Sequence, residues 1–113
     1  MTPIELILDE RRRRRRADIV RAAREIAALP AAQGLRLIVF GSAAWGKAHP
    51  DSDLDLLVDS ERQPASVWSE IERGAQLICA RLDVPLDLVF AWQAPDALIE
   101  RARTYGRAAS DLA

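Results

Sequence analysis

The chain has 113 residues, of which 50% are hydrophobic and 29% charged, a balance that predicts one soluble globular domain with a single core. No apolar run approaches the roughly 20 residues that span a bilayer, and the short apolar stretch at the N-terminus precedes its positive charges, the wrong order for a signal peptide. Cys79 is the single cysteine, so the sequence excludes an intrachain disulfide, and we expect a cytoplasmic protein.

The first third of the chain predicts a helical segment followed by a strand. Over residues 3–29 apolar side chains recur every three or four positions, which indicates one long helix or two consecutive ones. Pro30 and Gly34 end this segment. Residues 35–40 are nearly all apolar and rich in strand-forming types, as in a strand that is covered on both faces.

The next segment changes direction twice. Gly41 interrupts the strand, and Ser42 is a good N-cap for a short helical turn that ends at Trp45. Residues 46–52 are polar and predict a loop. Residues 54–58 (LDLLV) then predict a second strand.

Three prolines mark the elements of the second half. Pro64 suits the first turn of a helix that runs to about Leu82. Its apolar residues fall on one inner face: Val67, Trp68, Ile71, Ala75, Ile78 and Cys79. Pro85 opens a third strand over residues 86–90, and Pro95 starts a last helix.

We therefore expect a single α/β (α+β) domain, in which helices pack on a small mixed sheet. Its parts are an N-terminal helical segment at about 3–29, a core at about 35–92 and a C-terminal helix at about 96–107.

Asp53 and Asp55 carry the first indication of chemistry. Carboxylates at i and i+2 of a strand project from the same face, with Cα atoms about 6.5–7 Å apart. Two like charges on a mostly apolar strand repel each other and lose hydration unless a positive group lies between them. Oxygen ligands without His or Cys favour a hard divalent cation, Mg²⁺ or Mn²⁺. The alternative is a pair of solvated loop acids, which the flanking leucines argue against.

Gly41 and Ser42 directly follow the first predicted strand, and ten residues separate Ser42 from Asp53. Glycine lets a backbone approach an anion closely, and the following helical turn presents free N–H groups. A phosphate-binding turn beside a pair of carboxylates is what metal-assisted phosphoryl or nucleotidyl transfer requires.

Residues 40–58 (FGSAAWGKAHPDSDLDLLV) resemble the signature of the polymerase-β-like nucleotidyltransferases, which is a hydrophobic residue, Gly-Ser, about ten residues and Asp-hydrophobic-Asp. The short chain is similar to the minimal nucleotidyltransferases, the antitoxin half of two-gene modules whose toxin is a HEPN-type ribonuclease. The resemblance implies the nucleotidyltransferase fold and AMP transfer from ATP to a tyrosine hydroxyl of the cognate toxin.

The same resemblance implies roles for five residues. Gly41 and Ser42 would hold the triphosphate of ATP, while Asp53 and Asp55 would bind a pair of Mg²⁺ ions. A third carboxylate is expected from a later strand, where Asp87 shares a face with Val89, opposite to Leu86 and Leu88. It would complete the metal site and help to deprotonate the attacking hydroxyl. Asp83 is the competing candidate, and an edge-strand acid facing water is the alternative for Asp87.

The sequence departs from close relatives after the Gly-Ser pair. Relatives often have arginine at the positions of Ala43 and Trp45. Lys47 is a candidate replacement for the lost positive charge, and Trp45 would either stack on a nucleobase or pack. Base preference is therefore left open.

Other residues with possible chemistry have simpler explanations. The six consecutive arginines from position 11 to position 16 suggest nucleic-acid binding, but they point all around a helix beside Asp9, Glu10 and Asp18 and favour a solvated or partner-facing surface. His49 favours a surface position in the polar loop. Trp68, Cys79 and Trp92 favour the core, and Tyr105 favours packing or the surface over a role as nucleotide acceptor.

Three functions remain open from the sequence. The first is a Mg²⁺-dependent protein adenylyltransferase that acts as an antitoxin on a HEPN-type toxin. The second is an antitoxin that neutralises its toxin by binding alone. The third is a nucleotidyltransferase for small molecules or nucleic acids, which would need a substrate pocket that so short a chain has little material to build.

Overall fold

A four-stranded mixed sheet forms the centre of the computed structural model, which describes residues 1–45 and 50–112. Strand β1 (Arg36–Phe40) pairs antiparallel with β2 (Leu54–Asp59), which pairs parallel with β3 (Leu86–Phe90). The short strand β4 (Arg107–Ala108) pairs antiparallel with the other side of β1. The strand order is therefore β3-β2-β1-β4, with β3 and β4 at the edges.

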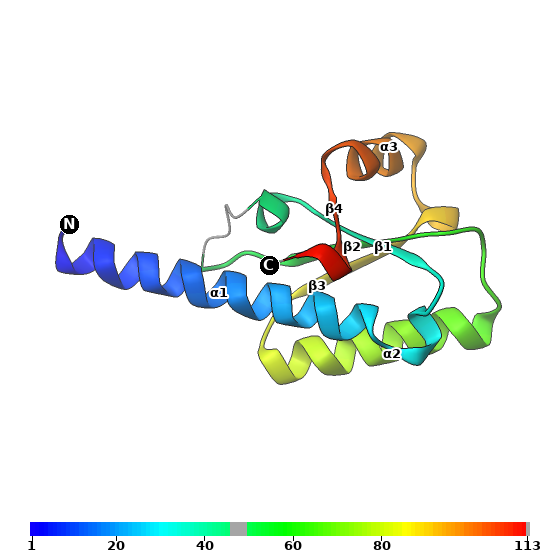
Figure 1. Ribbon diagram of the computed structural model, residues 1–113, viewed down its shortest axis with the longest axis horizontal. Coiled ribbons are helices and arrows are strands. Elements are labelled where there is room, and N and C mark those ends of the chain that lie inside the picture. The colour runs from blue at the N-terminus through cyan, green and yellow to red at the C-terminus, as the bar shows by residue number, and fades with distance from the viewer. Residues whose placement is uncertain (46–49, 113) are drawn as a thin grey trace.

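Helices cover both faces of this sheet. Helices α1 (Pro3–Ala27) and α2 (Ala65–Leu82) lie side by side on one face, and α3 (Asp96–Tyr105) lies on the other (Figure 1). In the described residues, 3₁₀ turns lie between these elements at η1 (Pro30–Ala32), η2 (Ser42–Trp45) and η3 (Ala91–Gln93), and a further turn, η4 (Ala109–Asp111), follows β4.

The alternation of side chains on β2 assigns a different role to each face. Leu54, Leu56 and Val58 are fully buried in the larger core beneath α1 and α2. Leu57 belongs instead to the smaller core under α3, so its neighbours at odd positions, Asp55 and Asp59, point to the same side. One face of the strand thus stabilises the fold, and the other carries its acidic groups.

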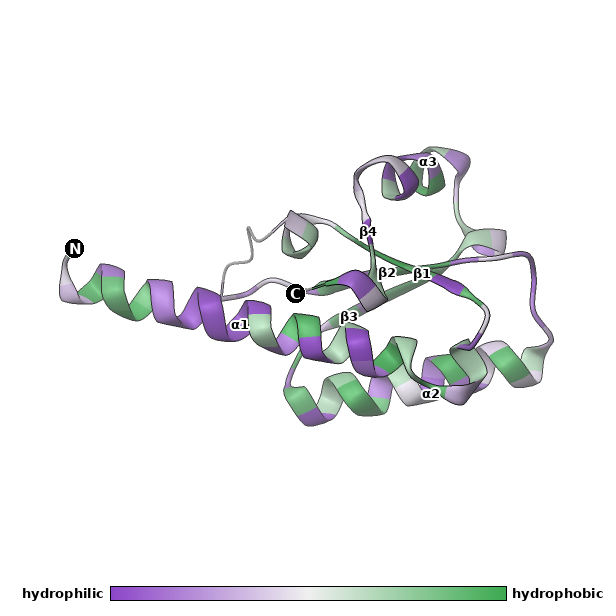
Figure 2. Cartoon of the chain, viewed as in Figure 1, coloured by the Kyte–Doolittle hydropathy of each residue, from purple (hydrophilic) through white to green (hydrophobic). Residues whose placement is uncertain are grey.

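The N-terminal half of helix α1 projects beyond the body that the helix packs against (Figure 1). Its N-terminus has a capping box, in which the hydroxyl of Thr2 accepts from the N–H of Glu5 and the Glu5 carboxylate accepts from the N–H of Thr2. Buried residues occur only in the second half of the helix, from Ile19 to Ile26. The first half extends away from the sheet, and Figure 2 shows apolar turns at its tip followed by a hydrophilic band.

The structure confirms most of the predicted elements. The helical segment is one helix, and the strand at residues 86–90 has the predicted bounds. Trp68, Cys79 and Trp92 pack in or against the larger core, as expected, and Phe90 contacts both indole rings. None of the helices in the described part of the chain has the length and apolarity required to cross a bilayer.

The C-terminal end differs from the prediction. The last helix ends at Tyr105 instead of about residue 107, and the next residues form β4, which the sequence did not predict. At Gly106 a side chain would collide with the carbonyl oxygen of Ala102 and a methyl group of Ile38. This close approach ends the helix and brings Arg107 into register with Val39 of β1.

Candidate active site

Asp55 and Asp87 are direct neighbours across the parallel pair of β2 and β3. Adjacent strands lie about 4.8 Å apart, and paired residues point to the same face. Val89, two residues after Asp87, packs with the smaller core under α3, so both carboxylates are on the α3 side. Asp53 is exposed and comes directly before β2, two positions from Asp55.

The electrostatics of Asp55 reflect this grouping. Burial raises the pKa of its carboxyl above the ordinary value, and the negative charges of Asp87 and Asp53 raise it further. Asp55 is thus close enough to Asp87 and to Asp53 to be repelled by both carboxylates. A cation placed among them would remove the repulsion, so the donor set fits a hard divalent ion such as Mg²⁺.

The carboxylates do not form a closed metal cage by themselves. In residues 1–45 and 50–112, no three His, Cys, Asp or Glu side chains are grouped tightly enough to hold an ion. Mg²⁺ in proteins is usually bound by one or two carboxylates together with substrate phosphates and water. An open acidic edge at Asp55 and Asp87 suits that mode of binding.

Gly41 lies against Asp55 because Phe40, the preceding residue, pairs with Asp55 across β1 and β2. The φ angle of Gly41 is +79°, and a Cβ atom at this position would lie 2.5 Å from Oδ2 of Asp55. Only glycine satisfies both conditions. Ser42 is exposed at the start of η2, and the N–H of Ala44 donates to the carbonyl of Gly41 at 3.3 Å. The predicted Gly-Ser turn therefore adjoins the predicted acidic strand.

A pocket of about 690 Å³ begins at these residues and extends beneath α3. Gly41 and Asp55 line one part of it, while Leu98 and Arg101 line the part formed by α3. Pockets for small-molecule ligands have volumes of about 300–1,000 Å³. The chain thus builds a ligand-sized pocket next to its acidic edge, which the sequence alone did not lead us to expect.

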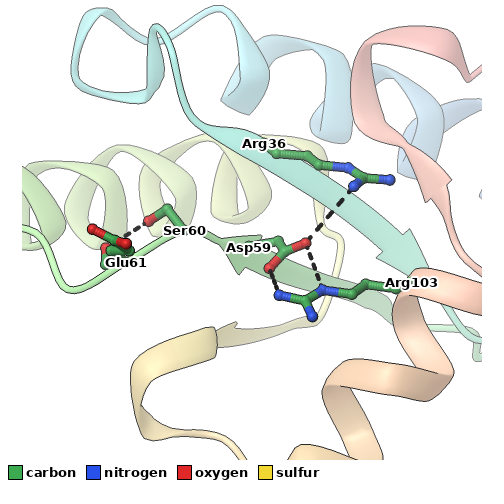
Figure 3. Close-up of polar contacts among 5 residues, drawn as sticks. All are labelled: Arg36, Asp59, Ser60, Glu61 and Arg103. Carbon is green, nitrogen blue, oxygen red and sulfur yellow. Dashed lines mark hydrogen bonds and ion pairs between the residues drawn. The ribbon is translucent and has the colours of Figure 1, made fainter.

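An ion pair fixes α3 above the sheet (Figure 3). Arg103 of α3 donates to Asp59 of β2 from Nε at 3.0 Å and from Nη2 at 2.8 Å. Arg36 lies 4.0 Å from the same carboxylate, whose side chain is 7% exposed. The hydrogen bond from Arg103 holds the pKa of Asp59 below its ordinary value, and the pKa of Arg103 is raised in return. The pair thereby holds one wall of the pocket in place.

The structure separates Asp83 from this site. Asp83 caps the C-terminus of α2 in a left-handed conformation, with φ of 54°. It borders a different cleft, together with Arg11, Arg14 and Arg15. Of the two candidates for the third carboxylate, only Asp87 adjoins Asp55.

The arginine run has internal partners. Arg15 donates from Nε to the carbonyl of Pro50 at 2.9 Å and from Nη1 to the carbonyl of Asp83 at 2.6 Å. Arg13 pairs with Asp9 at 2.6 Å, and Arg14 lies 3.8 Å from Glu10, as the sequence predicted. Lys47 and His49 lie outside the described residues.

Some residues of the site carried no recognisable signal. Arg101 and Arg103 belong to a helix without a motif, and their place depends on how that helix crosses the sheet. Tyr105, for which packing or a surface position was expected, is exposed and lines the pocket. Asp59 did have a signal, because it continues the alternating acidic face that begins at Asp53. The guanidinium of Arg107 lies 5.8 Å from the centre of the Trp45 ring, a contact that depends on the unpredicted strand β4.

A mixed sheet with a Gly-Ser turn beside acidic residues is the arrangement that we expected for a domain of the nucleotidyltransferase fold. The chain belongs to the nucleotidyltransferase domain family, whose model matches residues 10–105. This match confirms both the fold class and the family that residues 40–58 resemble. No curated protein matches the chain.

Solved structures with similar folds include antitoxin complexes. A toxin–antitoxin complex with AMP-PNP is 26% identical, with a TM-score of 0.55, over 83% of this chain and 71% of that chain. A doubly Asp-to-Glu-substituted MntA–HpeT toxin–antitoxin complex is 24% identical, with a TM-score of 0.54 and the same coverage. A tri-AMPylated Shewanella oneidensis HEPN toxin with its MNT antitoxin is 22% identical, with a TM-score of 0.48, over 87% and 71%.

Proposed function

We propose that this chain is the antitoxin of a toxin–antitoxin pair and transfers AMP from ATP to a hydroxyl of its partner, a HEPN-type toxin. The observation that carries the proposal is the contact of Gly41 with Asp55, beside Asp87. This contact places a turn that is suited to phosphate binding beside carboxylates that are suited to metal binding. The domain that contains them belongs to the nucleotidyltransferase family.

The residues of the site have separate roles in the proposed reaction. Gly41 and Ser42 would bind the triphosphate, because the turn is exposed and lies against Asp55, at the proposed metal site. Asp55 and Asp87, which pair across β2 and β3, and the neighbouring Asp53 would supply carboxylate oxygens to Mg²⁺, and substrate phosphates and water would complete its ligands. When bound, the metal neutralises phosphate charge and stabilises the leaving pyrophosphate.

The transfer itself is a single displacement. The acceptor oxygen forms a bond to the α-phosphorus, the bond from that phosphorus to the bridging oxygen breaks, and pyrophosphate leaves with the electron pair. Asp87 accepts the proton of the hydroxyl, since it is the most exposed carboxylate on a strand at this edge. A tyrosine hydroxyl of the toxin is the proposed acceptor.

Support for a protein partner comes from a solved relative. The 26%-identical structure is a toxin–antitoxin complex that contains AMP-PNP, a nucleotide triphosphate analogue. The tip of α1 offers a surface for such a partner, because Ile4, Leu6 and Ile7 are all more than half exposed. Apolar side chains gathered in this way commonly mark protein contacts.

The test is label transfer from α-labelled ATP. The purified chain is incubated with Mg²⁺, ATP and the protein encoded beside it, and label in the partner is measured by gel and mass spectrometry. We expect modification of a tyrosine, and loss of at least 100-fold in the Asp53→Ala, Asp55→Ala double variant. Glu70→Ala is the control, because it removes an exposed acid of α2, which lies on the opposite face of the sheet from α3.

Two outcomes would replace this proposal. If the double variant still neutralises the toxin in cells, the chain acts by binding alone. If label moves to a small molecule or a nucleic acid and never to an intact partner, the acceptor class is wrong.

A further inference from the structure

The two exposed aromatic side chains in the described part of the molecule border the same pocket. Trp45 is 57% exposed and Tyr105 is 64% exposed, whereas Phe40, Phe90, Trp68 and Trp92 are at least partly buried. Trp45 comes from η2 and Tyr105 from the last turn of α3, far apart in the sequence, yet both line the pocket that starts at Gly41 and Asp55. Core packing does not explain the position of two aromatic rings that are this exposed.

Trp45 has a charged neighbour, Arg107, which leaves more than half of the side chain exposed. The guanidinium of Arg107 lies 5.8 Å from the ring centre, a cation–π contact that holds one side of the indole against β4. The indole stays more than half exposed despite this contact. A flat ring that is fixed on one side and accessible elsewhere is a stacking surface.

The remaining walls of the pocket suit a ring with polar substituents. Phe40, Pro95 and Leu98 supply apolar surface, and Arg101 supplies hydrogen-bond donors and positive charge. The volume of about 690 Å³ falls within the range that holds a small-molecule ligand. The pocket is also continuous with the residues proposed to bind the triphosphate, to which a nucleoside is covalently joined.

We propose that the pocket between η2 and α3 binds the nucleoside of the nucleotide substrate, with its base stacked on Trp45 and Tyr105. The assignment rests on the proposed function, because it takes the phosphates to lie at Gly41 and Ser42. Stacking tolerates any base, since every base has a π-face, so this pair supplies affinity for the nucleoside. The acceptor then reaches the α-phosphate from outside the pocket.

The experiment compares binding of Mg·ATP with binding of Mg·tripolyphosphate by calorimetry. Trp45→Ala and Tyr105→Ala each remove one stacking ring, and we expect about 5- to 100-fold weaker binding of ATP. Binding of tripolyphosphate, which has no base, stays within twofold of the unsubstituted protein. Tyr105→Phe keeps the ring and should bind ATP normally. Both aromatic side chains are exposed, and thermal melts verify that the variants remain folded.

Leu77→Ala is the matched control, because Leu77 is an equally exposed large side chain (66%) on α2, across the sheet from the pocket. If the unsubstituted chain binds ATP but both alanine variants bind it equally well, the nucleoside lies elsewhere and the inference is wrong. Unchanged ATP binding with a raised KM for the acceptor assigns the pocket to the acceptor and also overturns it. If the chain binds neither ATP nor tripolyphosphate, the proposed function fails as well.

Discussion

Arg103 and Asp59 join the last turn of α3 to the end of β2 through two hydrogen bonds on one carboxylate. The acid is almost buried, whereas the arginine is half exposed. This bidentate geometry restricts how α3 can rotate over the sheet. Because the same helix carries Leu98, Arg101 and Tyr105, the pair also determines the shape of the pocket.

The Asp59→Asn substitution is expected to destabilise the fold in a pH-dependent manner. The pKa of Asp59 in the folded state lies below its ordinary value of 3.8, so its stabilising effect is complete above that pH and is lost as the pH falls through the folded-state pKa. Urea unfolding should show the variant to be less stable at neutral pH, with a difference that shrinks below pH 3.8. A difference that is independent of pH would mean that the charge of Asp59 is not involved.

Gly41→Ala and Gly34→Ala form a matched pair of variants. Both glycines have positive φ angles, +79° and +80°, so each substitution should cost about 1–2 kcal/mol of stability. A Cβ at position 41 would meet Oδ2 of Asp55, but a Cβ at position 34 would have no atom within 4 Å. We expect Gly41→Ala to reduce nucleotidyl transfer at least tenfold and Gly34→Ala to leave it unchanged. Equal activities would show that the approach to Asp55 is not needed for the reaction.

Substitution of Asp55 should reduce the stabilisation of the folded chain that a divalent ion provides. An acid with a raised pKa destabilises the fold as it ionises, so Asp55→Asn should be at least as stable as the unsubstituted chain without metal. Adding MgCl₂ at ten times its Kd should stabilise the unsubstituted chain by about 1.4 kcal/mol and the variant much less. Thermal melts measure both effects. Asp83→Asn, at the left-handed cap of α2, is the control that should keep the full response.

Cys79 is expected to be chemically inert in the folded protein. The thiol is buried in the larger core, and burial raises its pKa to about 11, so almost no thiolate exists at neutral pH. Alkylation by iodoacetamide, followed by mass spectrometry, should be slow in buffer and fast in urea. Fast alkylation of the native chain would contradict the packing of α2 described above.

The parts of the fold that follow from local patterns were predictable. The alternation in residues 54–58 gives the strand and places Leu54 and Leu56 in the core. The same alternation puts Asp87 on the face of Val89, and β2 and β3 pair so that Asp87 adjoins Asp55. Glycine and proline located most of the element ends because they restrict the backbone directly.

The parts that depend on contacts between distant segments were not predictable. β4 has two residues and exists only because Gly106 packs against β1, a contact that no local pattern reveals. The pocket likewise requires α3 to cross the sheet at the position set by Arg103 and Asp59. The sequence therefore indicated which groups carry the chemistry, but not the cavity beside them.

The alternation of apolar and acidic side chains on β2 determines what a shift in strand pairing would do to the site. A shift of one residue in the pairing of β1 and β2 would turn Leu54, Leu56 and Val58 toward α3 and bury Asp55 beneath α1 and α2. The large loss of apolar burial excludes that misregistered state from the native ensemble. Leu54, Leu56 and Val58 thus fix the strand register that keeps Asp55 on the α3 side, so the residues that stabilise the larger core also position the acid.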